Sequence, residues 1–599
     1  MNSTNSDDLF LDSEPYCEYR SSDPKSGPHS GSATTRGNMT TFTRSNRLKR
    51  TATLAIVATL VAASCGGSED ASETESPTET AVEAESSEGA GDSSEPAELS
   101  EGGGGSYSVG LPSFFVSNFA PGNSGASNID YALWTPLTQV SAETGELENM
   151  IADSLDTEDS REWTITIGEG WTFHDGSPIT AQSFVDAWNA VATPENTFDN
   201  NASMNIIEGY EAMNPAEGEE ATADTLSGLT APDDFTLNVT LNEPNALFPF
   251  LLASAAFAPL PEGVEDFEAF ATNPIGNGPF MMQEGGFTDG DQDVRLNRFD
   301  DYNGEVALAE SVDLRLYADP ASIYTDFQAG AIDVMLADGA DLADASTTYA
   351  DTIVDVPFPA MIYLAFPIDD ERFADPEVRQ AISRSIDRDS IVSALTGGFG
   401  TPSTALAPET MIGGGGDFCD ACSYDPEAAS AQLEAAGGFD GPLTLYTFQD
   451  PTNEAIVEAI SNQLRTDLGI EDVTFESQEI GLLYDSLFAG TLDGPTLLYA
   501  GAVFPHLYAL AEVTLLPGAG LNVTGYDSAE FNDLMAQAAS AADSDETIRL
   551  TQEAVSVALG DMPVTPILAP AGGLVYAENL SGVISEALGG VKLSAVQVN

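Results

Sequence analysis

The residue types that most often perform catalysis are scarce in this chain, which has three histidines and four cysteines among its 599 residues. Cys419 and Cys422 stand in the segment Phe-Cys-Asp-Ala-Cys-Ser-Tyr, and this spacing suits a redox pair, half of a zinc site or a local disulfide. A zinc site needs a second pair of cysteine or histidine ligands, which the folded part lacks, and the segment lies in a glycine-rich loop. We therefore expect a disulfide between Cys419 and Cys422 that clamps the loop before Asp425.

Sequence motifs of catalysis are also missing. The chain contains no His-Glu-x-x-His, no Gly-x-x-x-x-Gly-Lys and no Gly-x-Ser-x-Gly. Because it has 97 acidic residues, carboxylates lie near one another by chance, and no pair stands out as acid and base. His174 is interpreted as a turn residue, since Asp-Gly and Ser-Pro follow it. We expect no catalytic residue, no metal site and no cofactor, and hence a protein that is not an enzyme.

The charge balance is strongly acidic. The 97 acidic residues stand against 18 basic ones, for a net charge of -79, and only Lys25, Lys49 and Lys592 are lysines. Such a surface repels nucleic acid and anionic lipid, so neither is an expected partner. Two interpretations of this acidic composition stay open. It can be an adaptation to high ionic strength, where salt screens the self-repulsion, or a composition typical of the lineage without a salt requirement.

A short segment before Cys65 has the organisation of an export signal. Four basic residues between Arg44 and Arg50 precede the apolar run 54–63, which is followed by Ser-Cys-Gly. The run is short for a bilayer span, and a cysteine stands where cleavage would create a new N-terminus. We expect acylation of Cys65 and a lipid anchor on the outer face of the membrane. Ala62 departs from the preferred Leu of a lipoprotein box, so ordinary secretion remains the alternative.

The segments that flank this signal are interpreted from composition. Residues 1–38 show no periodicity, and a start at Met39 gives a signal peptide of normal length, so we expect 1–38 to be a misassigned extension and 39–64 to be the signal peptide. Residues 65–106 are rich in Glu, Ser and Gly, with almost no large apolar residue. This composition predicts a disordered acidic linker that spaces the folded part from the membrane.

After residue 106 the pattern predicts alternating strands and helices. Apolar residues alternate with polar ones at Trp163–Ile167, Phe235–Leu241 and Val312–Leu316, as in half-buried strands. Helices are expected after Asp375-Pro376, which should end by Gly397, after Asp425-Pro426, and from about Asp527. This alternation over nearly 500 residues predicts an α/β protein.

Several phrases, in order along the chain, resemble the bacterial extracellular solute-binding proteins of family 5, the oligopeptide- and dipeptide-binding type of ABC importer subunit. They are Ile151-Ala-Asp-Ser-Leu155, Trp171-Thr-Phe-His-Asp-Gly-Ser-Pro-Ile-Thr-Ala181, Asn273-Pro-Ile-Gly-Asn-Gly-Pro-Phe280, Asn297-Arg-Phe-Asp-Asp-Tyr302, Phe327-Gln-Ala-Gly-Ala-Ile-Asp333, Phe373-Ala-Asp-Pro-Glu-Val-Arg-Gln-Ala-Ile382 and Tyr424-Asp-Pro-Glu-Ala-Ala429. Within them, Arg379 and the nearby Arg388 are expected to pair with neighbouring carboxylates. The resemblance spans residues 107–599.

The resemblance implies a two-lobed periplasmic-binding-protein-like fold of class II with an extra subdomain on lobe I. The implied boundaries are 107–146, 249–355 and 569–599 for lobe I, 147–248 for the subdomain, and 356–568 for lobe II. The implied function is to capture a peptide-like or other small solute between the lobes and deliver it to the permease and ATPase subunits of an ABC importer. A ligand-sensing receptor on the same fold is the alternative, and a secreted hydrolase is a more distant one.

The resemblance also implies where the ligand binds. Peptide-binding members hold the α-amino group of the peptide with an Asp in a segment that corresponds to Leu497–Phe504, and that Asp falls at Gly501. Without this charge we expect a neutral or apolar ligand, such as an oligosaccharide, or a peptide held by its backbone. The expected ligand contacts are aromatic walls with a few polar groups, namely Phe114, Phe115, Asn118, Asn277, Tyr363, Tyr499, Gly501, Phe504 and His506.

Overall fold

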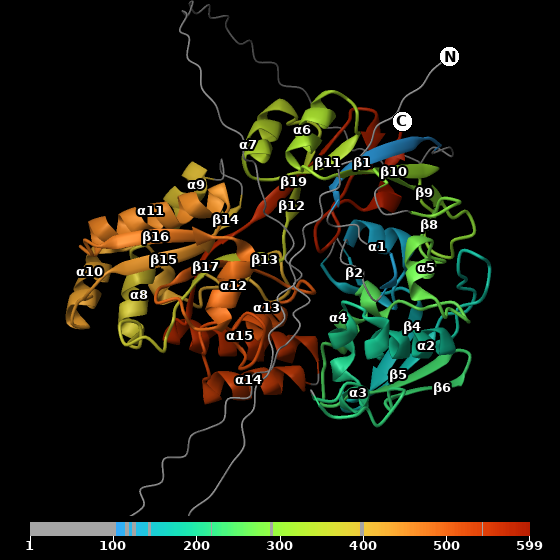
Figure 1. The fold of residues 1–599 in the computed structure, drawn as a ribbon, viewed down its shortest axis with the longest axis horizontal. Coiled ribbons are helices and arrows are strands. Elements are labelled where there is room, and N and C mark those ends of the chain that lie inside the picture. The colour runs from blue at the N-terminus through green and yellow to red at the C-terminus, as the bar shows by residue number, and fades with distance from the viewer. Residues whose placement is uncertain are drawn as a thin grey trace, which may run out of the picture. The chain divides into compact units, whose positions relative to one another are not determined.

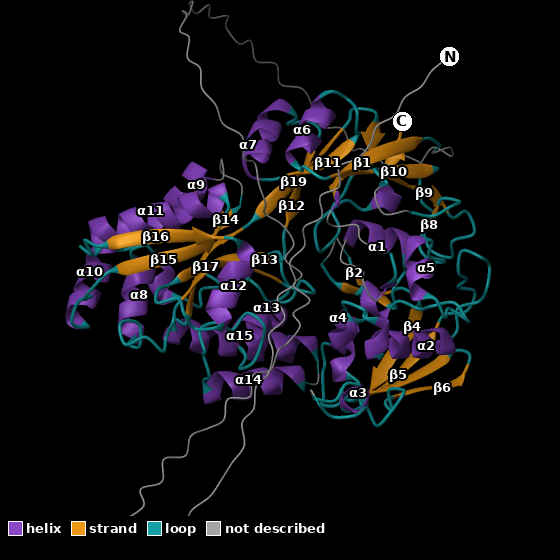
Figure 2. Cartoon of the chain, viewed as in Figure 1, coloured by secondary structure: helices purple, strands orange, loops and turns teal. Residues whose placement is uncertain are grey.

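The computed structural model describes residues 104–113, 119–121, 127–141, 145–216, 218–287, 291–395, 400–541 and 543–599. The predicted signal peptide, Cys65, nearly all of the predicted linker and the predicted contacts Phe114, Phe115 and Asn118 lie outside these residues. Along the described chain, helices and strands alternate (Figure 2), which confirms the predicted α/β class. None of the described helices combines the length and apolar character needed to cross a bilayer.

A seven-stranded sheet forms the centre of what we call lobe I (Figure 1). β1 pairs in parallel with β10 and β11, and β19 runs antiparallel to both β11 and β12. Val312 and Leu314, from the alternation that predicted a strand, are fully buried on β10. Across the sheet the strands are β12 (Ile353–Pro357), β19 (Ala571–Tyr576), β11 (Val334–Ala337), β1 (Ser106–Pro112), β10 (Ser311–Tyr317), β9 (Asp293–Arg298) and β8 (Phe280–Met282).

A six-stranded sheet forms the centre of lobe II. Its middle strand β13 is buried along its whole length because helices and loops cover both faces of the sheet, which explains its continuous apolar sequence. β13 pairs antiparallel with β17 and β18, whereas β15 and β16 are parallel. Across the sheet the strands are β14 (Thr401–Pro402), β18 (Val564–Ala569), β13 (Ala360–Ala365), β17 (Thr496–Gly501), β15 (Leu443–Phe448) and β16 (Val473–Gln478).

A smaller antiparallel sheet has the order β4 (Ala152–Thr157), β5 (Glu162–Ile167), β7 (Thr236–Thr240) and β6 (Leu229–Asp233). The predicted alternation on β5 is confirmed, since Trp163, Ile165 and Ile167 are buried. On β7 the strand begins at Thr236, and Phe235 lies in the preceding turn, where it is exposed. Two strand pairs complete the sheets, β2 (Thr138–Val140) with β3 (Leu147–Asn149), and β20 (Leu580–Ser581) with β21 (Gln597–Val598).

Helices begin where the sequence places carboxylate caps. Asp375 accepts a hydrogen bond from the Glu377 N–H at the start of α8, and Asp425 accepts one from Ala428 at the start of α10. The helices are α1 (Ser127–Leu133), α2 (Ala181–Ala192), α3 (Tyr210–Met213), α4 (Phe248–Leu251), α5 (Phe267–Thr272), α6 (Ala321–Gln328), α7 (Gly339–Thr348), α8 (Pro376–Arg384), α9 (Arg388–Leu395), α10 (Pro426–Ala435), α11 (Pro451–Asp467), α12 (Ile480–Phe488), α13 (Leu507–Leu515), α14 (Ala529–Ala539) and α15 (Ser544–Asp561).

One predicted helix differs in the structure. The single helix expected from Pro376 to about Gly397 is two helices, α8 and α9, and the chain turns between Ser385 and Asp387. Ser385 caps the turn because its hydroxyl donates to the Ile382 carbonyl. The helix expected from about Asp527 is confirmed as α14, with Phe531, Met535 and Ala538 on its buried face.

The chain crosses between the two large sheets through adjacent strands. β12 of lobe I leads through Phe358 into β13 of lobe II, and β18 of lobe II leads through Pro570 back into β19 of lobe I. These strands are neighbours in both sheets, because β12 pairs with β19 and β13 pairs with β18. The predicted domain boundaries stay a prediction, and β12 itself continues past 355 to Pro357.

Two buried arginines of lobe II bind carbonyl groups. Arg388 donates to the backbone carbonyls of Pro566 and Cys422 at 2.7 Å each and to the Thr565 hydroxyl at 2.9 Å. Arg379 donates to the Met562 carbonyl at 2.9 Å. Neither guanidinium forms an ion pair with a carboxylate of the described residues, so the expected pairing is wrong. The end of α15 at Met562 and the part of β18 where its register with β13 shifts leave carbonyls that need donors, and the fork of an arginine supplies several at once.

Arg388→Met should destabilise lobe II by about 3 kcal/mol, because it leaves several buried acceptors without a donor. Burial lowers the pKa of Arg388 to about 10, so the side chain is charged at neutral pH and its hydrogen bonds are charge-assisted. Urea unfolding followed by circular dichroism measures the change. Arg549→Met, which removes an exposed arginine from α15, is the matched control and should change the midpoint little. Equal midpoints for the two variants would contradict the assignment.

Candidate functional site

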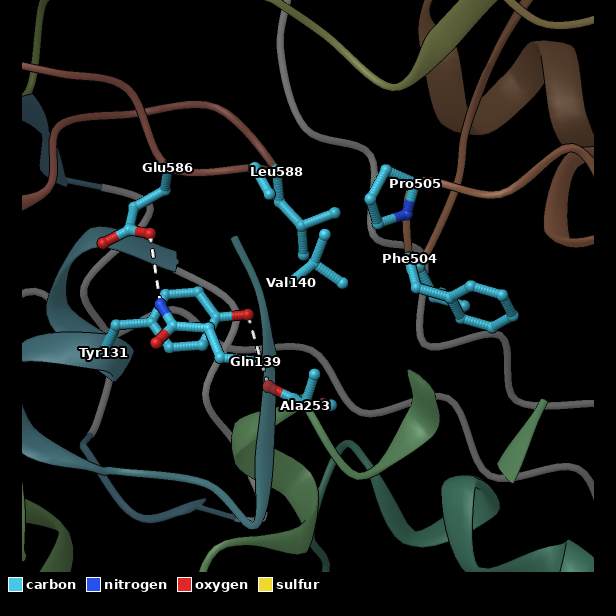
Figure 3. Close-up of a pocket in the computed structure, with 11 residues that line it drawn as sticks. Tyr131, Gln139, Val140, Ala253, Phe504, Pro505, Glu586 and Leu588 are labelled. Carbon is cyan, nitrogen blue, oxygen red and sulfur yellow. Dashed lines mark hydrogen bonds between the residues drawn. The ribbon is translucent and has the colours of Figure 1, made fainter. Parts of the chain in front are cut away.

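A pocket lies where lobe I faces lobe II (Figure 3). The pocket is small in this structure, with a cavity volume of about 10 Å³, which is the room of about one water molecule. Lobe I contributes three separate segments of the chain, and lobe II contributes the segment that follows β17. The lining residues are Tyr131, Gln139, Val140, Ala253, Ser254, Val503, Phe504, Pro505, Glu586, Ala587 and Leu588.

The wall on lobe I carries most of the polar groups. Tyr131 of α1 donates from its hydroxyl to the Ala253 carbonyl at 3.2 Å, and Gln139 of β2 donates from its amide to the Glu586 carboxyl at 3.4 Å (Figure 3). Burial raises the pKa of Tyr131 well above its usual value, and the nearby Glu586 and Asp130 raise it further. The phenol is therefore a neutral hydrogen-bonding group at any physiological pH.

Glu586 is placed by a tight hairpin near the end of the chain. Ser585 and Val591 form a β-bridge, the Glu586 N–H donates to the Gly590 carbonyl at 2.9 Å, and the Gly589 N–H donates back to Glu586 at 3.0 Å. Gly589 has φ +92°, and a Cβ atom there would lie 3.0 Å from the Phe358 ring. Only glycine suits this position, which seats the hairpin against the segment that crosses between the lobes.

The carboxyl of Glu586 is buried, with 6% of the residue exposed. Burial raises its pKa to about 7, although the positive charge of Lys592 and the hydrogen bond from Gln139 lower it in part. At neutral pH the carboxyl is thus close to its titration midpoint. Buried carboxyls behave in this way when the fold does not provide a full counter-charge.

The wall on lobe II is apolar. Val503, Phe504 and Pro505 follow β17, and Val503 is 60% exposed. Phe504 stacks on Phe250 of α4, with ring centroids 5.5 Å apart and the planes inclined by 24°. Phe250 precedes the lobe I segment that supplies Ala253 and Ser254 to the pocket, so this aromatic pair joins the two walls. Such a pair contributes roughly 0.5–1.5 kcal/mol beyond the area it buries.

Lobe II is also hydrogen-bonded to the region of the smaller sheet. The Ala246 N–H donates to the Ala539 carbonyl at 2.6 Å, and the Ser160 hydroxyl donates to the Ala541 carbonyl at 3.4 Å. Both acceptors follow or end α14. These bonds connect the two sides of the molecule at a second place, separate from the crossing strands.

Two of the predicted ligand contacts hold the fold. Asn277 is fully buried in lobe I, where its amide oxygen accepts from the Thr135 N–H at 3.2 Å and its NH₂ donates to the Thr135 carbonyl at 2.9 Å. His506 is fully buried and caps α13 by accepting from the Tyr508 N–H at 3.0 Å. Burial lowers the pKa of His506 to about 4, so the ring is neutral at pH 7. Neither side chain lines the pocket.

Three further predicted contacts belong to the central strands of lobe II. Tyr363 is fully buried on β13, and Tyr499 and Gly501 lie on β17, where Gly501 pairs with Ala360. Tyr499 is half-buried, and burial raises its pKa to about 12. A Cβ atom at Gly501 would lie 3.4 Å from the Tyr499 ring, which therefore covers this residue. Among the described predicted contacts, Phe504 alone lines the pocket.

The cysteines and His174 have structural roles. Cys419 and Cys422 form a disulfide, and the Cys422 carbonyl accepts a hydrogen bond from Arg388. His174 bridges the turn Gly276–Gly278, since one ring nitrogen accepts from the Gly276 N–H and the other lies 3.1 Å from the Gly278 carbonyl. Within the described ranges, no group of three or more histidine, cysteine and acidic side chains is arranged to hold a metal ion.

No pattern in the sequence indicated Tyr131, Gln139 or Glu586 as pocket residues. Gln139 lies on a three-residue strand and Glu586 in a glycine-rich hairpin, so neither belongs to a long periodic pattern. Glu586 is also one of 97 acidic residues. The weak signal that could have marked it is its apolar surroundings, Val-Ile-Ser before it and Ala-Leu-Gly-Gly after it.

Two α/β lobes joined by crossing strands, with a pocket between them, are the architecture of two-lobed solute-binding proteins. The family model for bacterial extracellular solute-binding proteins, family 5 (Middle), matches residues 146–503, more than half of the chain. The chain belongs to this family, as the phrases in its sequence indicate. The fold predicted for it, two lobes with a further subdomain, is confirmed.

Relatives of known name match most of the chain. The oligopeptide-binding protein OppA of Bacillus subtilis is 27% identical over 480 residues, which cover 76% of this chain and 85% of OppA. The dipeptide-binding protein DppE of Bacillus subtilis is 24% identical over 463 residues, covering 74% and 82%. The unliganded open form of the murein tripeptide-binding protein MppA has the same fold, with a TM-score of 0.72 at 21% identity over 82% of this chain and 97% of that one.

Tyr363→Phe tests whether Tyr363 is a core residue or a ligand contact. Its hydroxyl is buried and has no hydrogen-bond partner among the described residues. Removing an unpaired buried hydroxyl should leave the free energy of unfolding unchanged or raise it by about 1 kcal/mol, and ligand affinity should stay the same. Thermal unfolding and a ligand titration measure the two quantities. A loss of affinity without a loss of stability would instead make Tyr363 a ligand contact in another conformation.

Proposed function

We propose that this chain is the extracellular substrate-binding subunit of an ABC importer and that it captures a peptide-like solute between its lobes for a membrane permease. The observation that carries the proposal is a pocket whose walls come from both lobes, in a chain of the solute-binding family. A ligand held by both walls favours the arrangement in which they are close, and a partner that recognises this arrangement can distinguish the loaded protein from the empty one.

Several features support a peptide-like ligand and a binding role. The relatives OppA, DppE and MppA are named for oligopeptides, dipeptides and a murein peptide. The pocket combines an apolar wall with a few hydrogen-bonding groups, as binding sites for small organic molecules do.

The same proposal includes a lipid anchor at Cys65. An acylated N-terminal cysteine would keep the binding protein on the outer face of the membrane, near its permease, and the acidic segment after it would act as a spacer. The described residues leave the anchor untested, because the segment 1–103 lies outside them.

Cys65→Ser should move the protein from the membrane fraction to the medium, because serine cannot carry the thioether-linked lipid. Fractionation of cells that express each form and mass spectrometry of the N-terminal peptide measure the change. Cys17→Ser is the control and should leave both results unaltered. A mature wild-type N-terminus that begins at an unmodified Cys65, or elsewhere, would refute the anchor.

Phe504→Ala should raise the dissociation constant of the captured ligand about tenfold, because it removes one wall of the pocket and the stack with Phe250. Mass spectrometry of what co-purifies with the wild-type protein identifies the ligand, and calorimetric titration gives the constants. Phe235→Ala, which removes an exposed phenylalanine from the small sheet region, is the matched control.

The proposed function fails if no small molecule co-purifies and a peptide mixture leaves the thermal midpoint unchanged. The position of the site fails separately, if a ligand binds but Phe504→Ala and Phe235→Ala have the same affinity as the wild type.

A further inference from the structure

Among the described residues that line the pocket between the lobes, Glu586 is the only one with a charged side chain. The other lining groups are a phenol, an amide, one hydroxyl and apolar side chains. The carboxyl therefore determines the electrostatic potential in the pocket. The residue is 94% buried because its hairpin packs against lobe I. A ligand in the pocket meets this group on one side and the apolar Val503–Pro505 segment on the other.

The fold satisfies this carboxyl only in part. Among the described side chains, only Gln139 donates a hydrogen bond to the carboxyl, at 3.4 Å. The backbone carbonyl and N–H of Glu586 are paired within the hairpin. Lys592 attracts it from a distance, and no basic group of the described residues lies within ion-pair range of it. A buried carboxylate with so few partners is costly, and its pKa is raised to about 7 as a result. A positively charged ligand group would supply the missing partner.

We propose that Glu586 binds the cationic group of the ligand, an ammonium or a guanidinium, and so sets the substrate class as cationic, peptide-like solutes. The inference rests on the proposed function, in which this pocket holds the solute. It also explains how a chain with Gly501, where the resemblance expects an aspartate, can recognise an amino group, since the carboxylate comes from lobe I instead of lobe II. The terminal ammonium of a peptide and a Lys or Arg side chain offer the same chemistry.

The groups around Glu586 allow a clear pH dependence. Tyr131 on α1 stays protonated because burial raises its pKa, Lys592 on the C-terminal segment is cationic, and Asp130 on α1 is the other acid that acts on Tyr131. The facing segment of lobe II, Val503–Pro505, has no titratable side chain. Binding of a cation needs the ionised carboxylate, so affinity for a Lys or Arg side chain should rise with pH through about 7 and level off above it. Affinity for a terminal ammonium should rise in the same way and fall again from about pH 8, where that group loses its own proton.

Glu586→Gln should therefore weaken binding of cationic peptides roughly 10- to 100-fold at pH 8 and remove the pH dependence. Calorimetric titrations with trialanine, N-acetyl-trialanine and N-acetyl-Ala-Lys-Ala distinguish a terminal from a side-chain ammonium. N-acetyl-trialanine, which has no cation, should bind the wild type and the variant equally. Glu578→Gln, an exposed acid on the same C-terminal segment, is the matched control and should behave as the wild type.

Thermal unfolding of the empty protein separates this role from a structural one. The raised pKa means that the folded state holds its proton more tightly than the unfolded chain, so Glu586 lowers stability as pH rises from about 4.5 through about 7. Glu586→Gln should have a higher melting temperature than the wild type at pH 8 and the same one at pH 4. If Glu586 instead stabilises the fold, the variant melts lower at pH 8.

The outcomes distinguish this inference from the proposed function. Equal affinity of the wild type and Glu586→Gln for an ammonium-bearing peptide overturns the role of Glu586 and leaves the binding function intact. If none of the three peptides binds the wild type, the proposal of a peptide-like ligand is wrong. The role of Glu586 is then tested with the ligand that co-purifies with the protein. A ligand without any cationic group overturns the inference, and one with such a group and weaker binding to the variant supports it.

Discussion

The shared pair of strands is the constraint on which the rest of the structure depends. β12 and β19 are neighbours in the sheet of lobe I, and their continuations β13 and β18 are neighbours in the sheet of lobe II. Because strands cannot slide past one another without breaking their ladders, each lobe keeps its own register, and any rotation of one lobe relative to the other would have to bend the short segments around Phe358 and Pro570. The pocket opens beside these segments, so a small rotation there changes the distance between its walls.

One wall of the pocket carries its polar groups and the other is apolar, so the two walls can bind different parts of a ligand. Lobe I offers a carboxyl, an amide and a phenol that orient a polar group, whereas lobe II offers an apolar segment beside the Phe250–Phe504 stack. Desolvation strengthens the attraction of the carboxylate for a cation as the apolar wall approaches. The stack and the two hydrogen bonds from Ala246 and Ser160 hold the walls near each other.

Local signals predicted the fold well, whereas the residues that line the pocket are not marked by local signals. Asp375, Asp425 and the alternation of Trp163 and Ile165 predict their elements because caps and burial periodicity act within a few residues of sequence. The pocket instead joins Tyr131, Phe504 and Glu586, which are separated along the chain by 373 and 82 residues, and the topology of the sheets brings them together. Tyr363 and His506 are of the right types for a ligand contact, but the same aromatic character suits the core in which they are buried.

The position of β19 has a consequence for the order in which the chain can become folded. β19 (Ala571–Tyr576) lies between β11 and β12, in the interior of the lobe I sheet, whereas every strand of the lobe II sheet comes from the continuous stretch 360–569. As the chain emerges, lobe II therefore has all its strands before lobe I does. Until the last thirty or so residues arrive, β11 is an exposed edge of the sheet and β12 has no partner strand, and such strands are sites of aggregation. The segment that completes lobe I also carries Glu586, so the charged group of the pocket is synthesised after Tyr131, Gln139 and Phe504.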